Sequence, residues 1–482
     1  MHNIPDKGLG EERLFAKLTD FGKSDVPWHE GKTLAYIYDG GPNVERVAKR
    51  AYMQYLTENA LDPTVYPSLA RMERELVGYA SAHLGGDEMV VGNFTSGGTE
   101  SCLLAVKTAR DWLRAKKPDI REPEIILPVT AHAAFHKGAE YFGLKKIVLS
   151  VDPATFKPVP AEIEKAITPN TALVVASAVS YAHGVIDPVQ EIGAIALKHD
   201  VLFHVDGCIG GFILPYFRRL GTPVPPFDFS VPGVTSMSMD WHKYAYCPKG
   251  ASVILHRDKA LRRFQLFACS GWTGYTVVNP TILSAKSGGP LAAAWAVVNF
   301  LGDEGYLALA ERILKATRKI ITGIESIRGL RILGTPEANL VAFTADDFPI
   351  FHVIDEMKVL GWYVQPQFGF HGSKENIHLS IGQSVLEKAD AFVADLKTAV
   401  ERARAIPPSP VVELVKAELA KSAPGAVPDP AQMGRLMGAL GITGGRLPER
   451  MADLNQVLNL LPPQVTKVAL TDFFNDLFVQ PR

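Results

Sequence analysis

Short apolar runs alternate with helical segments through the middle of this chain, and this alternation constrains the fold more than any other feature. The runs lie at 124–129, 146–150, 172–179, 201–205 and 251–255, and a further short strand is expected at 234–239. Such uniformly apolar strands, separated by helices, favour a mainly parallel sheet that is covered on both faces. The sequence therefore predicts an α/β fold whose ligands bind at the carboxyl ends of the strands.

Composition narrows the class of protein. The 482 residues are 47% hydrophobic and 21% charged, which is typical of a globular protein of two or three domains. A net charge of −1 provides no overall field for nucleic acid or anionic lipid. The four cysteines, Cys102, Cys208, Cys247 and Cys269, have no metal-type spacing, so we expect reduced thiols and no metal site.

The first residues and the hydropathy of the chain predict where the protein is located in the cell. The first residues lack an apolar signal region, and no run approaches the ~18 apolar residues that span a bilayer. We therefore expect a soluble, cytoplasmic protein without stable membrane insertion and without a nucleic-acid partner.

Changes in composition predict four regions. Residues 1–67 form an N-terminal arm with a helix at 43–59, and residues 68–305 form a large domain whose first helix Ser68 is expected to cap. Residues 306–405 read as a small α+β domain. Residues 406–482 comprise a connection rich in proline and alanine and a helical tail, amphipathic from 432 onward.

A glycine pair precedes a helical pattern at 93–107, NFTSGGTESCLLAVK. Gly97, Gly98 and Thr99 stand where this helix begins. Backbone N–H groups that are unpaired at a helix start, together with the helix dipole, suit a phosphate. The alternative is a capped helix start with nothing bound, and the spacing is not that of a nucleotide P-loop.

Polar residues follow several strands at the edge where ligands are expected. His132, Ser177 and Asp206 each come at a strand end, and Lys243 follows the strand at 234–239. A buried aspartate is costly unless a cation pairs with it. Burial should lower the pKa of Lys243 and make its free amine available for imine chemistry. The alternatives are an aspartate that caps a turn, a core histidine and a surface lysine.

Together these features resemble a pyridoxal 5'-phosphate site. The resemblance implies that Lys243 links the cofactor and that Asp206 keeps the pyridine nitrogen protonated. A flat side chain such as His132 would stack on the ring, and the glycine loop would bind the phosphate. The order of these elements matches fold-type I enzymes, which implies a large domain with a seven-stranded sheet and a smaller α+β C-terminal domain.

Longer blocks identify a family. TSGGTES, AHAAFHKGAEYFG, HGVIDPV, HVDGCIGGF, GVTSMSMDWHKYAYCPKGAS and SGWTGYTVVNPTI resemble the sphingosine-1-phosphate lyases, in a prokaryotic soluble form, within the group II pyridoxal-phosphate decarboxylase superfamily. This resemblance implies cleavage of a phosphorylated sphingoid base into a fatty aldehyde and phosphoethanolamine. The alternative is an amino-acid decarboxylase on the same fold.

The resemblance also implies roles for single residues. Lys243 is the first candidate for moving the proton, with His242 and Tyr244 as alternatives, and Ser177 and His242 join the cofactor site. A homodimer with shared active sites is implied, in which Thr281 reaches the neighbour's cofactor phosphate.

The substrate phosphate is assigned in the same way to Lys249, with Tyr38 and Lys286 assisting. Two positions depart from the family pattern. Asp62 stands where these lyases have a histidine, and it would oppose an anion in the pocket. Ala285-Lys286 replaces a Ser-Arg pair, which keeps the charge but not the fork geometry.

Overall fold

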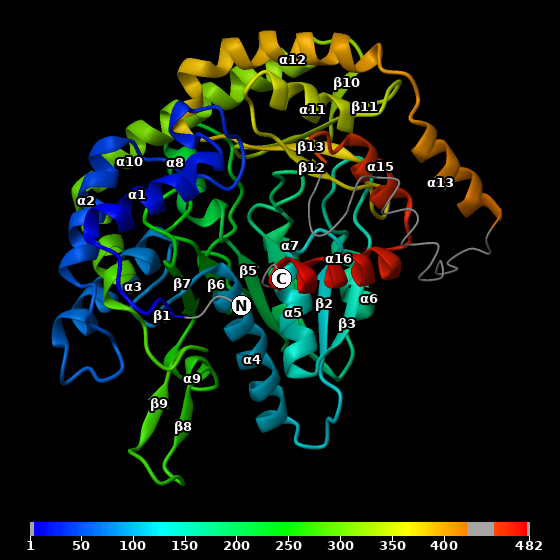
Figure 1. Ribbon diagram of the computed structural model, residues 1–482. Helices are drawn as coiled ribbons and strands as arrows, with labels where there is room; N and C mark the ends of the chain where they lie inside the picture. The colour runs from blue at the N-terminus through cyan, green and yellow to red at the C-terminus, as the bar shows by residue number, and fades with distance from the viewer. Residues whose placement is uncertain (1–3, 422–447, 480–482) are drawn as a thin grey trace.

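A seven-stranded sheet organises the large domain (Figure 1). The computed structural model describes residues 4–421 and 448–479. The strand order is β1-β7-β6-β5-β4-β2-β3. The strands are β1 (Val91–Thr95), β2 (Glu124–Pro128), β3 (Lys145–Leu149), β4 (Thr171–Ser177), β5 (Leu202–Asp206), β6 (Ser236–Met239) and β7 (Ser252–His256).

The prediction of a mainly parallel sheet is confirmed. Strands β3, β2, β4, β5 and β6 pair in parallel, whereas β7 is antiparallel to both β6 and β1. The sequence did not predict β1, because Gly92 and Asn93 interrupt its apolar pattern. The parallel set brings the carboxyl ends of β4, β5 and β6 to one edge.

Helices cover both faces of the sheet, as the apolar runs require. Successive residues of β4 point to opposite faces: Leu173 and Val175 pack with one hydrophobic cluster, and Val174 and Ala176 with another. The helices between the strands are α4 (Gly98–Lys116), α5 (Ala133–Phe142), α6 (Pro160–Ala166), α7 (Val189–Lys198) and α8 (Gly210–Arg219). Residues of α4 and α5 belong to the first cluster, and residues of α7 and α8 belong to the second.

A smaller C-terminal domain packs above the large one (Figure 1), which confirms the predicted α+β domain. Its antiparallel sheet has the order β10-β11-β13-β12. The elements are β10 (Leu330–Ile332), β11 (Leu340–Ala345), α11 (Phe351–Val359), β12 (Gln365–Gln367), β13 (Asn376–Ser380), η3 (Gln383–Lys388) and α12 (Ala389–Arg404). Helix α10 (Gly288–Glu325), kinked at Gly302, runs from the large domain into the core of this one.

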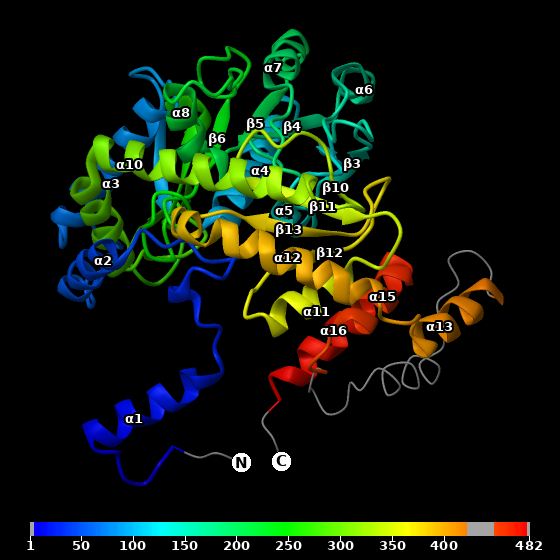
Figure 2. The same cartoon turned by 90° about the horizontal axis from the view of Figure 1, so that it is seen from above.

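The N-terminal region begins with α1 (Glu11–Phe21), which has no buried residue and stands away from the body in Figure 2. The turns η1 (Gly22–Ser24) and η2 (Trp28–Glu30) lead to α2 (Pro42–Gln54) and α3 (Pro67–His83). The predicted cap at Ser68 is wrong, because Tyr66 is the N-cap and Pro67 opens the helix. The helix predicted at 43–59 ends at Gln54.

The remaining elements lie outside the two sheets. Helix α9 (Lys259–Arg262) precedes a projecting arm made of β8 (Phe267–Cys269) and β9 (Val277–Asn279). The C-terminal region contains α13 (Pro410–Lys421), α15 (Ala452–Leu460) and α16 (Pro463–Leu477), whose apolar residues form a cluster of their own. The part of the predicted tail at 432–447 lies outside the described residues. No helix in the described ranges is long and apolar enough to cross a membrane.

Candidate active site

A cavity of about 370 Å³ lies at the carboxyl ends of the parallel strands. It brings together eight residues that the sequence nominated, namely Gly97, Gly98, Thr99, His132, Ser177, Asp206, His242 and Lys243. Ser177 and Asp206 end strands β4 and β5, and the other six residues follow β1, β2 and β6. The prediction that they meet at one sheet edge is therefore realised in a single chain.

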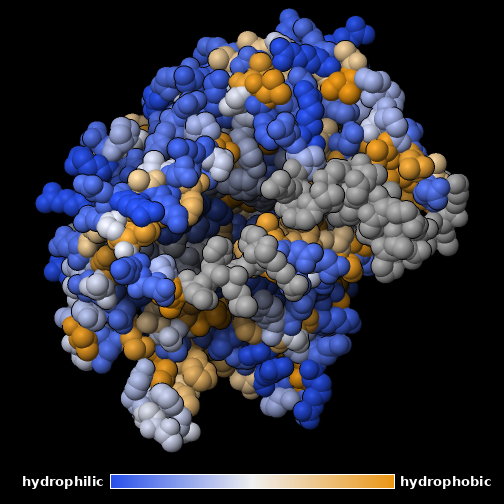
Figure 3. All heavy atoms as spheres, in the orientation of Figure 1, coloured by the Kyte–Doolittle hydropathy of each residue, from blue (hydrophilic) through white to orange (hydrophobic). Residues whose placement is uncertain are grey.

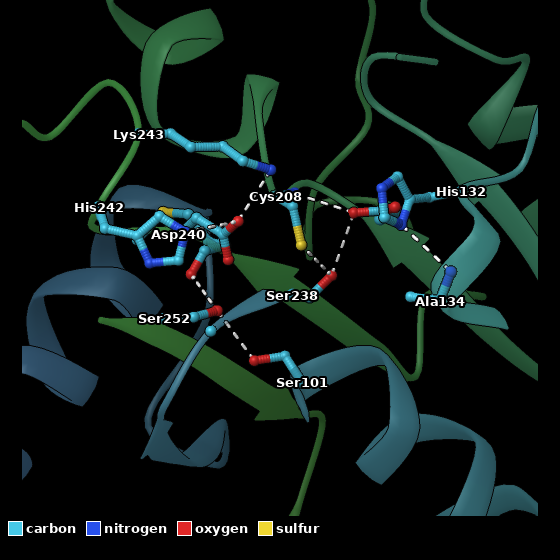
Figure 4. A network of polar contacts seen from close by, with 12 residues as sticks. Ser101, His132, Ala134, Cys208, Ser238, Asp240, His242, Lys243 and Ser252 are labelled. Carbon is cyan, nitrogen blue, oxygen red and sulfur yellow. Dashed lines mark hydrogen bonds and ion pairs between the residues drawn. The ribbon is translucent and has the colours of Figure 1, made fainter. Parts of the chain in front are cut away.

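Lys243 lies in the turn that follows β6, and its partner is Asp240. Lys243 Nζ lies 2.8 Å from Asp240 Oδ2, and the Asp240 side chain is almost fully buried (Figure 4). Burial disfavours the ammonium, but attraction to Asp240 outweighs it and raises the pKa of Lys243 well above its usual value. The expectation that burial lowers the pKa of Lys243 is therefore wrong for the free side chain.

His242 lies beside the same aspartate. Its Nε2 is 3.6 Å from Asp240 Oδ2, and its Nδ1 accepts a hydrogen bond of 3.2 Å from the backbone N–H of Ala251. Burial lowers the pKa of His242 to about 4, although Asp240 opposes this shift. The imidazole is therefore neutral near pH 7 and cannot act there as a cationic donor.

Asp206 ends β5, and its carboxylate accepts two neutral hydrogen bonds. The backbone N–H of Cys208 donates to Asp206 Oδ1 at 3.0 Å, and the hydroxyl of Ser238 donates at 3.3 Å. Ser238 in turn lies 3.2 Å from His204 Nε2, because β5 and β6 place Asp206 opposite Ser238. Among the described residues, the buried Asp206 forms no ion pair.

The start of α4 forms the side of the cavity that suits an anion. Gly97 is the N-cap and offers no side-chain cap for the helix. A Cβ on Gly98 would lie 2.7 Å from Asp240 Oδ2, so only glycine allows this close approach. The buried Glu100 accepts from the backbone N–H groups of Ser96 and Ile282, at 2.6 and 2.8 Å.

His132 caps α5, with its Nδ1 accepting from the backbone N–H of Ala134 at 3.2 Å. Its ring meets Tyr181 edge to face, at 6.4 Å between centroids. The Tyr181 hydroxyl donates to Gln365 Oε1 at 2.6 Å, which ties this wall of the cavity to the small domain. Tyr181 therefore connects the ring of His132 to the small domain.

Tyr38 and Lys249 line a second cavity that adjoins the first at His242. The ammonium of Lys249 lies 4.6 Å from the centre of the Tyr38 ring. Burial and the charge of Lys243 lower the pKa of Lys249 to about 8, and burial raises the pKa of Tyr38 to about 12. Tyr244 is buried, packs on Tyr38 at 5.1 Å and does not line the Lys243 cavity.

Three nominated residues lie elsewhere within the single chain. Asp62 is exposed, and its carboxylate accepts from the backbone N–H and hydroxyl of Thr64 at 2.8 and 2.7 Å. Lys286 is buried in an ion pair with Glu73, beside a separate cavity. Thr281 is buried, and its hydroxyl donates to the carbonyl of Leu283 at 2.9 Å. Asp62 and Lys286 are therefore not brought to the Lys243 cavity of their own chain.

Some lining residues were not nominated from the sequence. They include Asp240, Tyr181, Cys208, Cys102 and Glu100. Asp240 left a usable signal, because it is an acid three residues before Lys243, directly after a buried strand. The role of Tyr181 depends on a contact with β12 that no local pattern shows.

Cys102, Asp206 and Cys208 place possible metal ligands within 4.8 Å of one another. Contact with Cys102 and burial raise the pKa of Cys208 well above its usual value. Both cysteine thiols are therefore protonated near pH 7 in the protein as described, and Asp206 is the one charged group of the three.

Comparisons with known proteins agree with this geometry. A family model described as "Pyridoxal-dependent decarboxylase conserved domain" matches residues 56–346. A second, "Pyridoxal-dependent enzyme, C-terminal putative HTH domain", matches residues 411–476. A sphingosine-1-phosphate lyase from Dictyostelium discoideum is 38% identical over 401 residues, which cover 83% of this chain and 74% of that protein. One from Arabidopsis thaliana is 39% identical over 412 residues, covering 84% and 74%.

This chain belongs to the sphingosine-1-phosphate lyase family. The solved structure of such a lyase from Burkholderia pseudomallei K96243 has a TM-score of 0.80 and 37% identity, and covers 84% of this chain and 93% of that one. A glutamate decarboxylase from Lactobacillus brevis has a TM-score of 0.73 at 20% identity, over 85% of this chain and 97% of that one, which shows the shared fold.

Pyridoxal phosphate is the cofactor of this family, and the cavity fits it. Asp206 is a buried carboxylate without a cationic partner among the described residues, and a protonated pyridine nitrogen is such a partner. The uncapped start of α4 suits the cofactor phosphate. Lys243 opens into the same cavity and carries the amine that the cofactor's aldehyde requires.

Proposed function

We propose that this chain cleaves phosphorylated sphingoid bases, sphingosine-1-phosphate among them, into a fatty aldehyde and phosphoethanolamine. The observation that carries the proposal is the position of Lys249 and Tyr38, which stand beside the Lys243 cavity and suit a phosphate ester. Family membership supports the same substrate, since relatives 33–39% identical are named for it.

Four residues of the cavity have a proposed task toward the cofactor. Pyridoxal phosphate, when bound, draws the electrons of the broken carbon–carbon bond into its ring. Asp206 would hold a proton on the pyridine nitrogen by a charge-assisted hydrogen bond. The backbone at Gly98 and Thr99 would bind the cofactor phosphate, and His132 would stack on the ring.

Proton transfer falls to Lys243 and its partner. Lys243 Nζ lies 2.8 Å from Asp240, which favours the ammonium form of the lysine. When it is not joined to the cofactor, this ammonium would return a proton to the carbon that the departing aldehyde leaves. His242 has a pKa of about 4 and Tyr244 lies outside the cavity, so both are weaker candidates for this step.

An assay of two products tests this proposal. The holoenzyme is incubated with a phosphorylated sphingoid base and, separately, with aromatic amino acids, and aldehyde and carbon dioxide are measured. Aldehyde from the base alone is expected, with none from a Lys243→Ala control. Carbon dioxide from an amino acid, without aldehyde from the base, would favour the alternative decarboxylase.

We also propose a homodimer with shared active sites. The projecting arm of β8 and β9 supports it, because Phe267, Trp272 and Val278 on this arm are exposed. Figure 3 shows hydrophobic surface on the part of the molecule where the arm projects. Apolar residues on an extended arm favour contact with another chain. Thr281 follows this arm and stays the candidate for the neighbour's cofactor phosphate. Sedimentation should show a dimer, and an active monomer at the assay concentration would contradict the proposal.

A further inference from the structure

The second cavity is an apolar groove of about 400 Å³ in which only Tyr38 and Lys249 have been assigned a role so far. It lies between α2, residues 36–41 and residues 246–249, and we call it the α2 groove. Its wall includes Val44, Ala48 and Met53 of α2. Two charged side chains of α2 reach it, but Glu45 and Lys49 form an ion pair of 2.7 Å with each other. The other two charged lining residues, Asp39 and Lys249, are of opposite sign, so the groove offers apolar surface with little net charge.

The α2 groove adjoins the reacting end of the site. His242 lines both the groove and the Lys243 cavity. Tyr38 and Lys249, the residues assigned to the substrate phosphate, line the groove itself. A molecule whose phosphate lies at Lys249 therefore already reaches the wall of the groove.

The cavity beside Lys286 offers a poorer surface for an apolar ligand. It measures about 810 Å³, and its wall includes Glu73, Arg74, Arg262 and Lys286. Covering these charged groups with hydrocarbon would cost free energy. This cavity also shares no lining residue with the Lys243 cavity.

We propose that the α2 groove binds the alkyl chain of the phosphorylated sphingoid base, an inference that rests on the proposed function. The phosphate-bearing carbon and the chain-bearing carbon are both attached to the amine-bearing carbon. Both substituents therefore leave the reacting centre within a short distance of Lys249 and His242. The phosphate stays at Lys249, and the chain continues along Val44, Ala48 and Met53.

Binding of saturated alkyl phosphates tests the groove without any cleavage. These probes lack the amine and the scissile bond, and calorimetry with the holoenzyme, below their micelle concentration, measures their affinity. Each added methylene should tighten binding about fourfold until the groove is full. Ala48→Met should shorten the range of chain lengths over which binding tightens, because its longer side chain occupies part of the groove.

Ala70→Met is the matched control. Ala70 lies on α3 and lines the charged 810 Å³ cavity, so the same substitution there should leave the dependence on length unchanged. An unchanged dependence in Ala48→Met would overturn the proposal. Loss of the dependence in Ala70→Met alone would also overturn it, since the chain would then occupy the other cavity.

A second pair of variants places a charge at the rim, where the fold tolerates it. Met53 and Met89 are both largely exposed, but only Met53 lines the α2 groove. Met53→Asp should weaken the longer alkyl phosphates at least tenfold, whereas Met89→Asp should not. If Met53→Asp instead converts a dimer to monomers, the groove belongs to a second copy of the chain and the proposal fails.

Turnover separates this inference from the proposed function. Aldehyde release from bases of increasing chain length should follow the same pattern in kcat/KM. If the bases are cleaved but kcat/KM does not depend on chain length, the proposed function holds and the proposal that the α2 groove binds the alkyl chain is wrong. If alkyl phosphate binding depends on chain length but no base is cleaved, the proposed function is wrong, whereas binding of an alkyl chain in the α2 groove is supported.

Discussion

The ion pair between Lys243 and Asp240 sets the charge at the reacting centre. Burial lowers the pKa of Lys243, whereas attraction to Asp240 at 2.8 Å raises it. The attraction is the larger effect, so the pKa of Lys243 is raised. A lysine whose pKa is raised stays an ammonium through the neutral range, as a proton donor must. The neighbouring Lys249, whose pKa is lowered to about 8, behaves in the opposite way.

Replacing Asp240 by asparagine should lower the pKa of Lys243, because burial then acts without opposition. The alkaline limb of the pH–rate profile, where the donor loses its proton, should move to lower pH. We expect kcat to fall by about 10²-fold, within the range of general acid catalysis. Asp472→Asn, at an exposed position, should leave the profile unchanged. An unmoved alkaline limb in Asp240→Asn would show that the pair does not control the proton.

Lys249 should make substrate affinity depend on pH. Its folded pKa is about 8, so the ammonium is present below that pH and is lost above it. KM for a phosphorylated base should therefore rise above about pH 8, and Lys249→Arg should move that rise to higher pH. Steady-state kinetics across pH measure it, with cofactor absorbance as the check on the site. An equal preference of Lys249→Ala and the parent for phosphorylated over unphosphorylated bases would remove Lys249 from phosphate recognition.

At the scale of elements, the start of α4 meets the turn after β6. Gly98 allows this contact, since a Cβ there would lie 2.7 Å from Asp240 Oδ2 and 2.9 Å from Cys208 Sγ. Both neighbours are buried in the wall of the cavity. The helix start and the lysine turn therefore depend on one glycine for their relative position.

Gly98→Ala should loosen cofactor binding by displacing the helix start, with a rise in Kd of about tenfold or more for ~1.4 kcal/mol of strain. Titration of the cofactor-free protein with pyridoxal phosphate, followed by absorbance, measures it. Gly78→Ala on α3 is the control, because its Cβ meets nothing within 4 Å. That control should bind cofactor normally and gain about 0.5 to 1 kcal/mol in stability. Equal Kd values for the two variants would contradict the argument.

The sequence predicted those elements whose signal is local. Apolar runs gave the positions of β2, β4 and β5, and the residues that close them meet at one edge because parallel strands end together. Strand β1 escaped prediction, since its sequence VGNFT lacks a continuous apolar run. The antiparallel direction of β7 depends on the turn at 240–251, which strand patterning does not reveal.

The limits of prediction at the site have a similar cause. Asp206 and Lys243 were found because a charge at the end of a buried strand is conspicuous. The pairing of Lys286 with Glu73 and of Asp62 with Thr64 depends on which neighbours the fold supplies. The pKa of Lys243 was mispredicted because burial was weighed without Asp240. Tertiary partners, rather than residue types, decide these cases.

At the scale of the whole molecule, the large and small domains contact each other beside the active site. We call this domain contact, made by residues 156–187 on one side and 333–373 on the other, the seam. Tyr181 and His183 of the large domain contact Gln365 and Ser373 of the small domain, at 2.6 and 3.0 Å. Phe156 and Val185 pack with Leu333 and Ala342 in one small apolar cluster. Because Tyr181 also lines the cavity, the relative position of the two domains fixes one wall of the site.

Glu337 is the residue on which this seam should depend most. It pairs with Lys157 at 2.7 Å and accepts from the backbone N–H of Ile186 at 2.8 Å, so it links both sides of the seam. Glu337→Ala should leave that N–H without a partner in a buried setting and lower the free energy of unfolding by about 1 to 3 kcal/mol. The urea midpoint of the holoenzyme measures the loss.

Glu311→Ala is the matched control for that measurement. Glu311 also forms an ion pair of 2.7 Å, with Lys315, but both side chains are more than half exposed and lie one helical turn apart. Such exposed pairs contribute about 0.3 to 0.5 kcal/mol, so its midpoint should move little. If the two variants shifted the midpoint equally, the seam would contribute no more than a surface ion pair. The wall at Tyr181 would then be held by the apolar cluster and by the hydrogen bonds to Gln365 and Ser373.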